Sequence, residues 1–224
     1  MDVLNELLKM QDSGYKAFHS KLMPTVSNEK IIGVRVPNLR KFAKDFYKTG
    51  EYKEFLDALP HTYYEEDNVH AFLIEQIKDF EMALQYTESF LPYIDNWATC
   101  DMFMPKVFKD NSQKLLPYIN SWLESEKTYT VRYGIKLLMD LFLDEKFERC
   151  YMDAVANIHS DEYYVKMMVA WYFATALFKQ YDMALYYIED KKLDDWTHNK
   201  AIQKAIESNR IPKDIKTYLK TLKI

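Results

Sequence analysis

The residues best suited to chemistry lie in the stretch 96–101 (Asn-Trp-Ala-Thr-Cys-Asp), which sets an indole and a carboxylate four residues apart. If this stretch is helical, Trp97 and Asp101 share one face, because side chains at that spacing are neighbours on a helix. An arginine, Arg132, and a second tryptophan, Trp171, follow on two later segments that we also predict to be helices. Two aromatic rings, an acid and a base could therefore line a single groove.

Taken one at a time, these four residues also have ordinary structural interpretations. Indoles commonly anchor helix packing, so Trp97 and Trp171 could be core or groove-edge aromatics. Asp101 could be a solvated helix residue, and Arg132 could pair with a neighbouring helix. The residues alone leave both interpretations open.

The remaining candidates for chemistry show no functional grouping. Trp122 and Trp196 are predicted to be packing residues. The five histidines form no HExxH pattern or catalytic group: His19, His61, His70, His159 and His198. The sequence therefore supports neither metal nor nucleophilic chemistry, and we expect no metal and no cofactor.

The elements that must position these residues are predicted to be helices. With 224 residues, of which 48% are hydrophobic and 16% aromatic, the chain can bury a sizeable core. Only four glycines and seven prolines leave little material for hairpin turns. Leu, Met, Ala, Glu and Lys, which favour helices, are abundant. The composition predicts an all-α fold.

Helical periodicity continues along the chain with short polar breaks. Asn96 is a good N-cap residue for the segment that carries Trp97. We predict helices at residues 2–11, 28–48, 51–58, 67–77, 79–91, 96–108, 112–125, 128–143, 146–157, 161–178, 181–189, 195–208 and 212–222.

Two short patterns occur twice. Leu91–Trp97 (LPYIDNW) recurs as Leu116–Trp122 (LPYINSW), and Glu81–Leu84 (EMAL) recurs as Asp182–Leu185 (DMAL). Weak similarity of this kind favours degenerate helix-pair repeats over a four-helix bundle. Because each pair buries one face on its neighbour, stacked pairs predict an α-solenoid with a concave groove, forming a single domain over residues 1–224.

Basic residues are concentrated at two places. Residues 191–224 hold nine Lys or Arg against four Asp or Glu, a local balance of +5 in a chain of net charge −4. Lys200 and Lys204 share a helical face there. A second basic patch lies near the N-terminus: Arg35, Arg40, Lys41 and Lys44. Both could equally be solvated faces of exposed helices.

The two cysteines and the apolar runs indicate the compartment. Cys100 and Cys150 have no CxxC partner and no metal-ligand spacing, and the N-terminus lacks a secretory pattern. No apolar run reaches the roughly 18 to 20 residues of a membrane span. We therefore expect a cytoplasmic protein with free thiols and no membrane association. We also expect a monomer.

Several of these motifs together resemble a known family. In order along the chain they are Ile32–Lys41 (IGVRVPNLRK), Trp97 with Asp101, Arg132, Trp171, and Asn199–Ile206 (NKAIQKAI). Their order and separation resemble the DNA alkylation repair family of HEAT-like repeat DNA glycosylases over nearly the whole chain. The resemblance implies an α-solenoid that holds duplex DNA in a basic concave groove. Active members are monofunctional glycosylases that release cationic N3- or N7-alkylated purines without flipping the base.

The resemblance also implies roles for individual residues. Asp101 would face the sugar and stabilise its oxocarbenium-like charge, which suits a carboxylate because a cationic alkylpurine is already a good leaving group. Trp97 and Trp171 would pack against the deoxyribose and stabilise cationic charge with their ring faces. The implied DNA-binding residues are Arg132, for a backbone phosphate, and Arg35, Arg40, Lys41, Lys200 and Lys204.

The N-terminal region resembles a short branch of the family. Met1 lies only about 30 residues before the motif Gly33–Pro37, so we expect the additional N-terminal helical element of active relatives to be reduced. Members of this branch can keep the Trp and Asp positions and lack glycosylase activity. The segment Tyr15–Lys21 is either a loop or a partial replacement of the missing element. Three interpretations stay open: an alkylpurine DNA glycosylase, a catalytically silent module for double-stranded, branched or damaged DNA, and a protein-binding solenoid.

Overall fold

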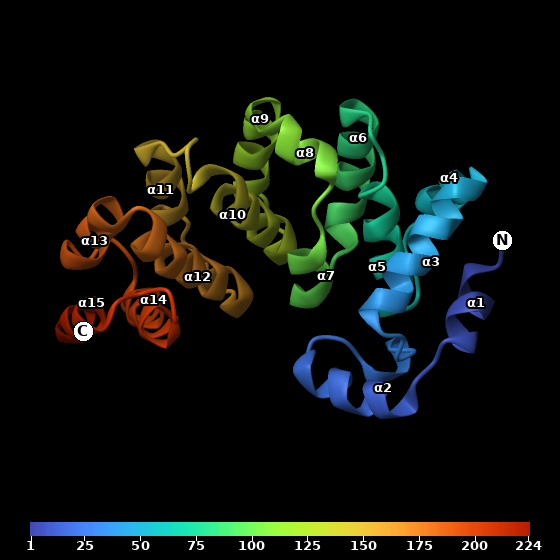
Figure 1. Ribbon diagram of the computed structural model, residues 1–224, viewed down its shortest axis with the longest axis horizontal. Helices are drawn as coiled ribbons and strands as arrows, with labels where there is room; N and C mark the ends of the chain where they lie inside the picture. The colour runs from blue at the N-terminus through green and yellow to red at the C-terminus, as the bar shows by residue number, and fades with distance from the viewer. The chain divides into compact units, whose positions relative to one another are not determined.

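A computed structural model of the protein describes all residues from Met1 to Ile224 and contains helices without any strand (Figure 1). The all-α prediction is confirmed, and successive helices pack in the repeat-like arrangement of an α-solenoid. The α-helices are α1 (Val3–Lys9), α2 (Ser13–His19), α3 (Val36–Thr49), α4 (Tyr52–Asp57), α5 (Tyr64–Ile74), α6 (Phe80–Phe90), α7 (Trp97–Met102), α8 (Lys106–Asp110), α9 (Ser112–Leu123), α10 (Thr128–Phe142), α11 (Arg149–Ala156), α12 (Tyr163–Lys179), α13 (Tyr181–Glu189), α14 (Asp195–Glu207) and α15 (Lys213–Thr221). Three short 3-10 helices are η1 (Ser20–Leu22), η2 (Asn28–Lys30) and η3 (Leu91–Tyr93).

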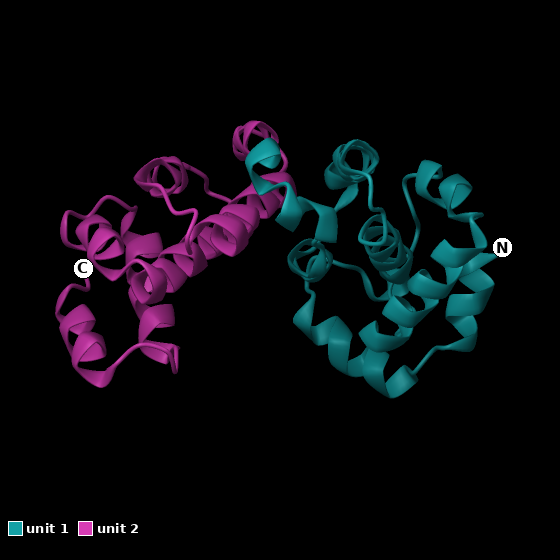
Figure 2. Cartoon of the chain, turned by 45° about the horizontal axis from the view of Figure 1, so that its top comes forward, with its two compact units in different colours: residues 1–115 teal, residues 116–224 magenta.

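The chain forms two compact units, residues 1–115 and 116–224, and the boundary lies within α9 (Figure 2). The prediction of one continuous domain over residues 1–224 therefore stays a prediction. None of the helices combines the length and the apolar character that a membrane span requires. Neither cysteine forms a disulfide: Cys100 is buried and Cys150 is exposed.

The first unit is organised around α5. Nine of its eleven residues are buried, which requires neighbours on all sides of the helix. The buried residues include a carboxylate, Glu65, which accepts backbone N–H bonds from Ile32 at 2.8 Å, Gly33 at 2.7 Å and Val34 at 3.2 Å. Three such bonds replace the water that a buried carboxylate loses. Glu65 thereby fastens the segment before α3 to the central helix.

The segment before α3 was predicted to be helical, and the structure corrects this prediction. The predicted helix 28–48 is wrong at its start, because residues 31–35 are not helical and α3 begins at Val36. Gly33 has a φ of +96°, a conformation that side chains disfavour, and a Cβ there would lie 2.6 Å from the Lys16 Cβ and 2.8 Å from the Asp12 carbonyl oxygen. Since the N–H groups of this segment bond to Glu65, they cannot enter a helix ladder.

A second predicted helix is also wrong in part. The predicted helix 96–108 is interrupted, because α7 ends at Met102 and α8 begins at Lys106, with Pro105 between them. A proline disfavours helical geometry at the residue before it and lacks an N–H.

The segment around Tyr15 is helical as α2, with the Asp12 side chain accepting the Tyr15 N–H at 2.8 Å. The other predicted helices are confirmed to within three residues at each end.

The second unit is built on α12, which packs against α10, α13 and α14. Its core contains large aromatic side chains that are fully buried, among them Tyr133, Tyr172, Phe173 and Tyr187. The helix α12 has a buried side and an exposed side. Residues 172, 173, 176 and 177 are buried, while Trp171 and Phe178 are exposed. Trp171 and Phe178 are therefore available to line a surface groove.

Candidate functional site

The short helix α7 presents the tryptophan and the carboxylate together. The Asn96 side chain accepts the Thr99 N–H at 2.8 Å, which confirms the predicted N-cap. Ala98, Thr99 and Cys100 form the buried side of the helix. Trp97 and Asp101 lie four residues apart on it and are both partly exposed, so the predicted common face exists.

Trp97 also holds the N-terminal segment in place. Its Nε1 donates a hydrogen bond to the Leu22 carbonyl oxygen at 3.1 Å. Its ring packs against a buried apolar cluster formed by Met23, Val26, Ile31, Tyr64 and Ala98. The indole therefore has both a packing role and an accessible edge, and its orientation is fixed by a directional bond.

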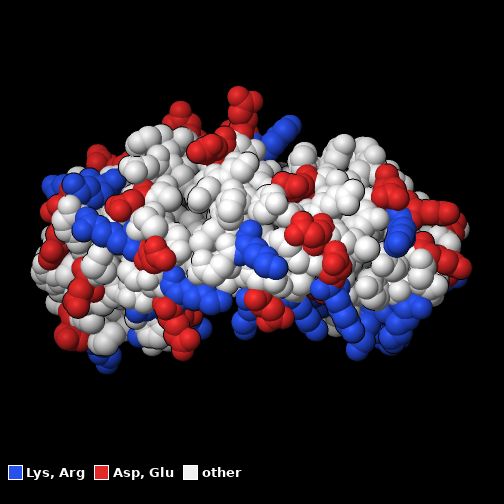
Figure 3. All heavy atoms as spheres, turned by 90° about the horizontal axis from the view of Figure 1, so that it is seen from above, with Lys and Arg blue, Asp and Glu red and all other residues white.

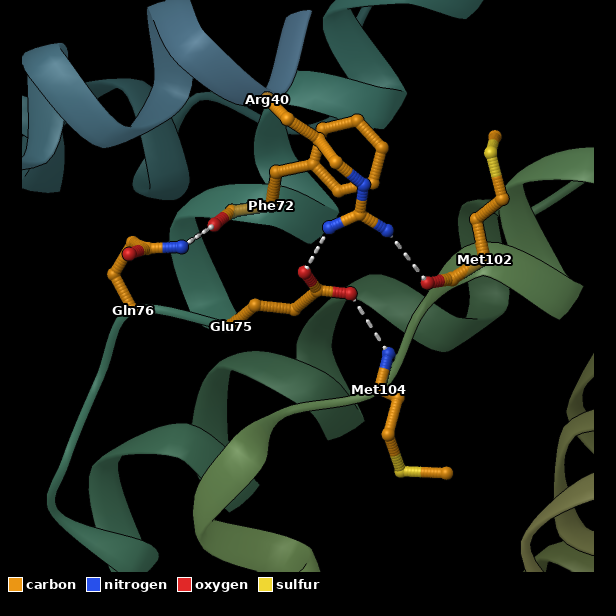
Figure 4. Close-up of polar contacts among 6 residues, drawn as sticks. All are labelled: Arg40, Phe72, Glu75, Gln76, Met102 and Met104. Carbon is orange, nitrogen blue, oxygen red and sulfur yellow. Dashed lines mark hydrogen bonds and ion pairs between the residues drawn. The ribbon is translucent and has the colours of Figure 1, made fainter. Parts of the chain in front are cut away.

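The chain that follows Asp101 is held by an ion pair (Figure 4). The Arg40 guanidinium bonds to the Glu75 carboxylate and donates to the Met102 carbonyl oxygen at 3.3 Å. It also lies 3.9 Å from the centre of the Phe72 ring. Glu75, which is 8% exposed, accepts the Met104 N–H at 3.0 Å with its other oxygen. Arg40, predicted to bind DNA, thus supports the C-terminal end of α7, and nothing in the sequence pattern pointed to Glu75.

The other N-terminal cations are on the surface. Arg35 pairs with Asp12 at 2.9 Å and lies 5.0 Å from the Tyr15 ring centre, while Lys41 pairs with Asp45 at 3.0 Å. The Tyr15 N–H and the Arg35 guanidinium lower the pKa of the Asp12 carboxyl. Exposed pairs of this kind contribute little stability, so their cations can exchange partners. Lys and Arg side chains gather over this unit along the lower right edge of Figure 3.

In the second unit, Arg132 is a buried residue with 4% of its surface exposed. Its Nη1 donates to the Tyr164 carbonyl oxygen at 2.7 Å and joins α10 to α12. The interhelical interpretation from the sequence therefore has a clear structural basis. Its role in binding phosphate stays a prediction.

Trp171 is 40% exposed, and Lys204 lies beside it with Nζ 5.9 Å from the ring centre. Lys200 lies instead over Trp196, at 5.6 Å, and Lys166 lies 5.3 Å from the same ring. Trp196 is 37% exposed, so its predicted packing role is only part of its environment. Lysines over indole faces form cation–π contacts, and the same cations can reach an anionic ligand.

A comparison with known families matches residues 3–207 to the family model of DNA alkylation repair enzymes. The chain belongs to this family. The match includes α7, Arg132, Trp171 and Lys204, the elements on which the resemblance was based. No curated protein matches the chain in a direct sequence search.

In this family member, the predicted groove residues lie in both units. Trp97 and Asp101 belong to the first unit, and Arg132 and Trp171 belong to the second. Their convergence on one concave surface therefore stays a prediction. The structure contains no group of three or more His, Cys, Asp or Glu side chains that could hold a metal ion.

A carboxyl pair near the start of α7 was not predicted. Asp67 and Asp95 line a cavity of about 100 Å³, together with Lys30, His61 and Tyr93. Burial raises the pKa of Asp67 to about 8, and the charges of Asp95 and Glu66 add to the effect while Lys30 opposes it. A protonated carboxyl at neutral pH can donate a hydrogen bond. The two aspartates are far apart in sequence, and no spacing rule would have paired them.

Proposed function

We propose that this protein binds DNA as a monomer and excises cationic N3- or N7-alkylated purines by hydrolysis of the N-glycosidic bond, without flipping the base. The observation that carries the proposal is α7, which presents Trp97 and Asp101 on one face in a chain of the DNA alkylation repair family. The helix is fixed at its start by Asn96 and at its end by Arg40 with Glu75. Such fixing of a carboxylate and an aromatic ring is the preorganisation that catalysis requires.

The chemistry follows from the charge on the lesion. When the glycosidic bond from C1′ to N9 of the alkylated purine breaks, its electron pair passes to the base and neutralises it, and the sugar becomes an oxocarbenium-like cation. The Asp101 carboxylate stabilises that cation as it forms. A water molecule then adds its oxygen to C1′ and loses a proton, leaving an abasic sugar and a neutral alkylpurine. No cofactor enters this balance.

The aromatic and basic residues complete the proposal. The faces of Trp97 and Trp171 carry negative quadrupole charge, so they favour a cationic sugar packed against them. Lys200 and Lys204 bind backbone phosphates, and Arg35, Arg40, Lys41 and Arg132 add further positive charge. Contacts to phosphates position the duplex without selecting a sequence.

The test is an excision assay on N7-methylated duplex with abasic sites as the readout. We expect the parent protein to release methylpurine and Asp101→Asn to lower the rate about a hundredfold or more, with duplex affinity within about twofold, because the lost charge acts mainly in the transition state. The matched control is Glu126→Gln, since Glu126 also follows a tryptophan by four residues but lies beyond the end of its helix. Equal excision by parent and Asp101→Asn would remove Asp101 from the mechanism.

A second candidate is binding of double-stranded or branched DNA without excision. It is favoured by the partly exposed Lys200 and Lys204, which can contact phosphates whether or not a base is released. A salt series of duplex binding separates it from a protein-binding solenoid, because phosphate contacts release counterions and make affinity fall steeply with salt. Binding without release of methylpurine supports the second candidate, and no binding at low salt supports the protein-binding solenoid.

A further inference from the structure

One side of α12 carries two large exposed side chains with two small side chains between them. Trp171 and Phe178 are 40% and 45% exposed and lie two helical turns apart, or about 10 Å along the axis. Between them on the same face are Ala174 and Thr175, whose small side chains leave space above the helix. The two aromatic rings thus form the ends of a groove, and the small side chains of Ala174 and Thr175 form its floor.

The opposite wall comes from the end of α14 and the residues after it. A groove of about 390 Å³ lies between the two walls, and its second wall consists of Lys204, Glu207, Ser208 and Arg210. The Lys204 Nζ lies 5.9 Å from the Trp171 ring centre, and the Arg210 guanidinium carbon lies 5.6 Å from that of Phe178. Each exposed ring therefore has a cation beside it.

We propose that this groove binds one unpaired nucleotide, with its base stacked on Phe178 and its phosphate held by Arg210, next to the duplex contacts of Trp171 and Lys204. The inference rests on the proposed function for the duplex contacts, and it adds a separate pocket. Stacking on aromatic side chains combined with basic residues along the backbone is how proteins bind single-stranded nucleic acid. A volume of about 390 Å³ is within the range of small-ligand pockets.

The chemistry of the groove favours a nucleotide over other ligands. A fully paired duplex hides its base faces in the stack, so it cannot use an exposed ring as a platform. An acidic peptide would satisfy Lys204 and Arg210 but offers no flat surface for the two rings. Glu207 is held by a bond from Gln203 Nε2 at 2.8 Å and lines one side of the groove, where it can accept from an exocyclic amino group of a base.

The experiment compares a duplex that carries a single unpaired thymidine with the same duplex fully paired, by fluorescence anisotropy over a salt series. We expect the parent to bind the bulged duplex at least fivefold more tightly, because one base on an aromatic ring contributes about 1–3 kcal/mol. Phe178→Ala should remove most of that preference and leave the affinity for paired duplex within about twofold. Arg210→Ala should weaken bulged-duplex binding and reduce its salt slope by about one.

The matched control is Tyr186→Ala. Tyr186 is 38% exposed on α13 and also has two cations near its ring, Arg149 at 5.0 Å and Lys192 at 5.6 Å, but it does not line the groove. It should leave both affinities unchanged. Equal binding of both duplexes by the parent, or equal losses in Phe178→Ala and Tyr186→Ala, would overturn the pocket.

Failure of the proposed function gives a different result. If the parent does not bind paired duplex at low salt, the proposed function, which requires duplex binding, is contradicted. The pocket is then decided by single-stranded oligothymidylate alone: binding that Phe178→Ala removes supports it, and absence of binding overturns it. Circular dichroism and the thermal midpoint establish that each exposed substitution leaves the fold intact.

Discussion

The two copies of the LPYI pattern adopt different structures. Residues 91–97 form the 3-10 helix η3, a break and the first residue of α7, whereas residues 116–122 lie within the continuous helix α9. Trp97 therefore begins a helix and is partly exposed, while Trp122 is near the end of one and is 5% exposed. Seven similar residues thus place one tryptophan at a surface and the other in a core.

The difference comes from the residues around the tryptophan. Asn96 turns its side chain back to cap the following helix, and this leaves Trp97 and Asp101 on one face. In the second copy, Ser121 lies inside α9 and the helix ends at Leu123, before Glu126. Both copies contain a tryptophan followed by an acid, and only one places the pair on the same helix.

The largest expected effect is on stability at Trp122. Its ring lies 5.6 Å from that of Tyr133 and is buried, so Trp122→Ala should lower the free energy of unfolding by about 3–5 kcal/mol. Trp97→Ala should cost less, about 1–3 kcal/mol, because that ring is partly exposed. Urea unfolding measures both. A larger loss at Trp97 than at Trp122 would reverse the comparison.

An intermediate effect is expected at the cap. Asn96→Ala removes the acceptor of the Thr99 N–H, and we expect a loss of about 1 kcal/mol in the free energy of unfolding. Ser121→Ala, at the equivalent position of the second copy, should change it by less than about 0.5 kcal/mol, because alanine suits a helix interior. Thermal unfolding of the pair tests whether capping distinguishes the copies.

The smallest effect of a substitution is expected at another position where the copies differ, Asp95 against Asn120, and it concerns the pH dependence of stability. The pKa of Asp67 is raised to about 8 in the fold, so the folded state holds a proton that the unfolded state releases above pH 4. Stability should therefore fall as the pH rises from about 4 to about 8. Asp95→Asn removes one carboxylate facing Asp67 and should make the fall shallower.

The same titration has a direct control. Asp67→Asn removes the group itself, and the remaining charges around the cavity, Glu66, Lys30 and His61, are unchanged. Its thermal midpoint should lose this part of the pH dependence. A parent whose stability rises over the same pH range relative to Asp67→Asn would contradict the raised pKa.

Local signals in the sequence predicted much of the fold. The helix content, the cap at Asn96 and the common face of Trp97 and Asp101 follow from residue types at short spacing. Pro105 is a local signal for the interruption after α7, although the helical pattern on both sides favours one continuous helix. The non-helical segment at Gly33 could not be predicted, because it depends on Glu65, a partner more than 30 residues away.

Long-range pairing also limits the prediction of the site. Arg40 is one of several basic residues near the N-terminus, and only the structure joins it to Glu75 and to the carbonyl of Met102. The pairing of Asp67 with Asp95 has the same origin. Spacing within a helix identifies residues that share a face, and it carries no information about which helices meet.

The three bonds from residues 32–34 to Glu65 have a consequence for the thermodynamics of ligand binding. A segment that becomes ordered only when ligand arrives loses conformational entropy at that moment, at about 1–2 kcal/mol for each residue. Here the segment that connects α2 to α3 is already ordered by a buried carboxylate. Basic residues near both ends of it, Lys16 and Arg35, are thus ordered in advance, so a polyanionic ligand that contacted them would not incur that entropic cost.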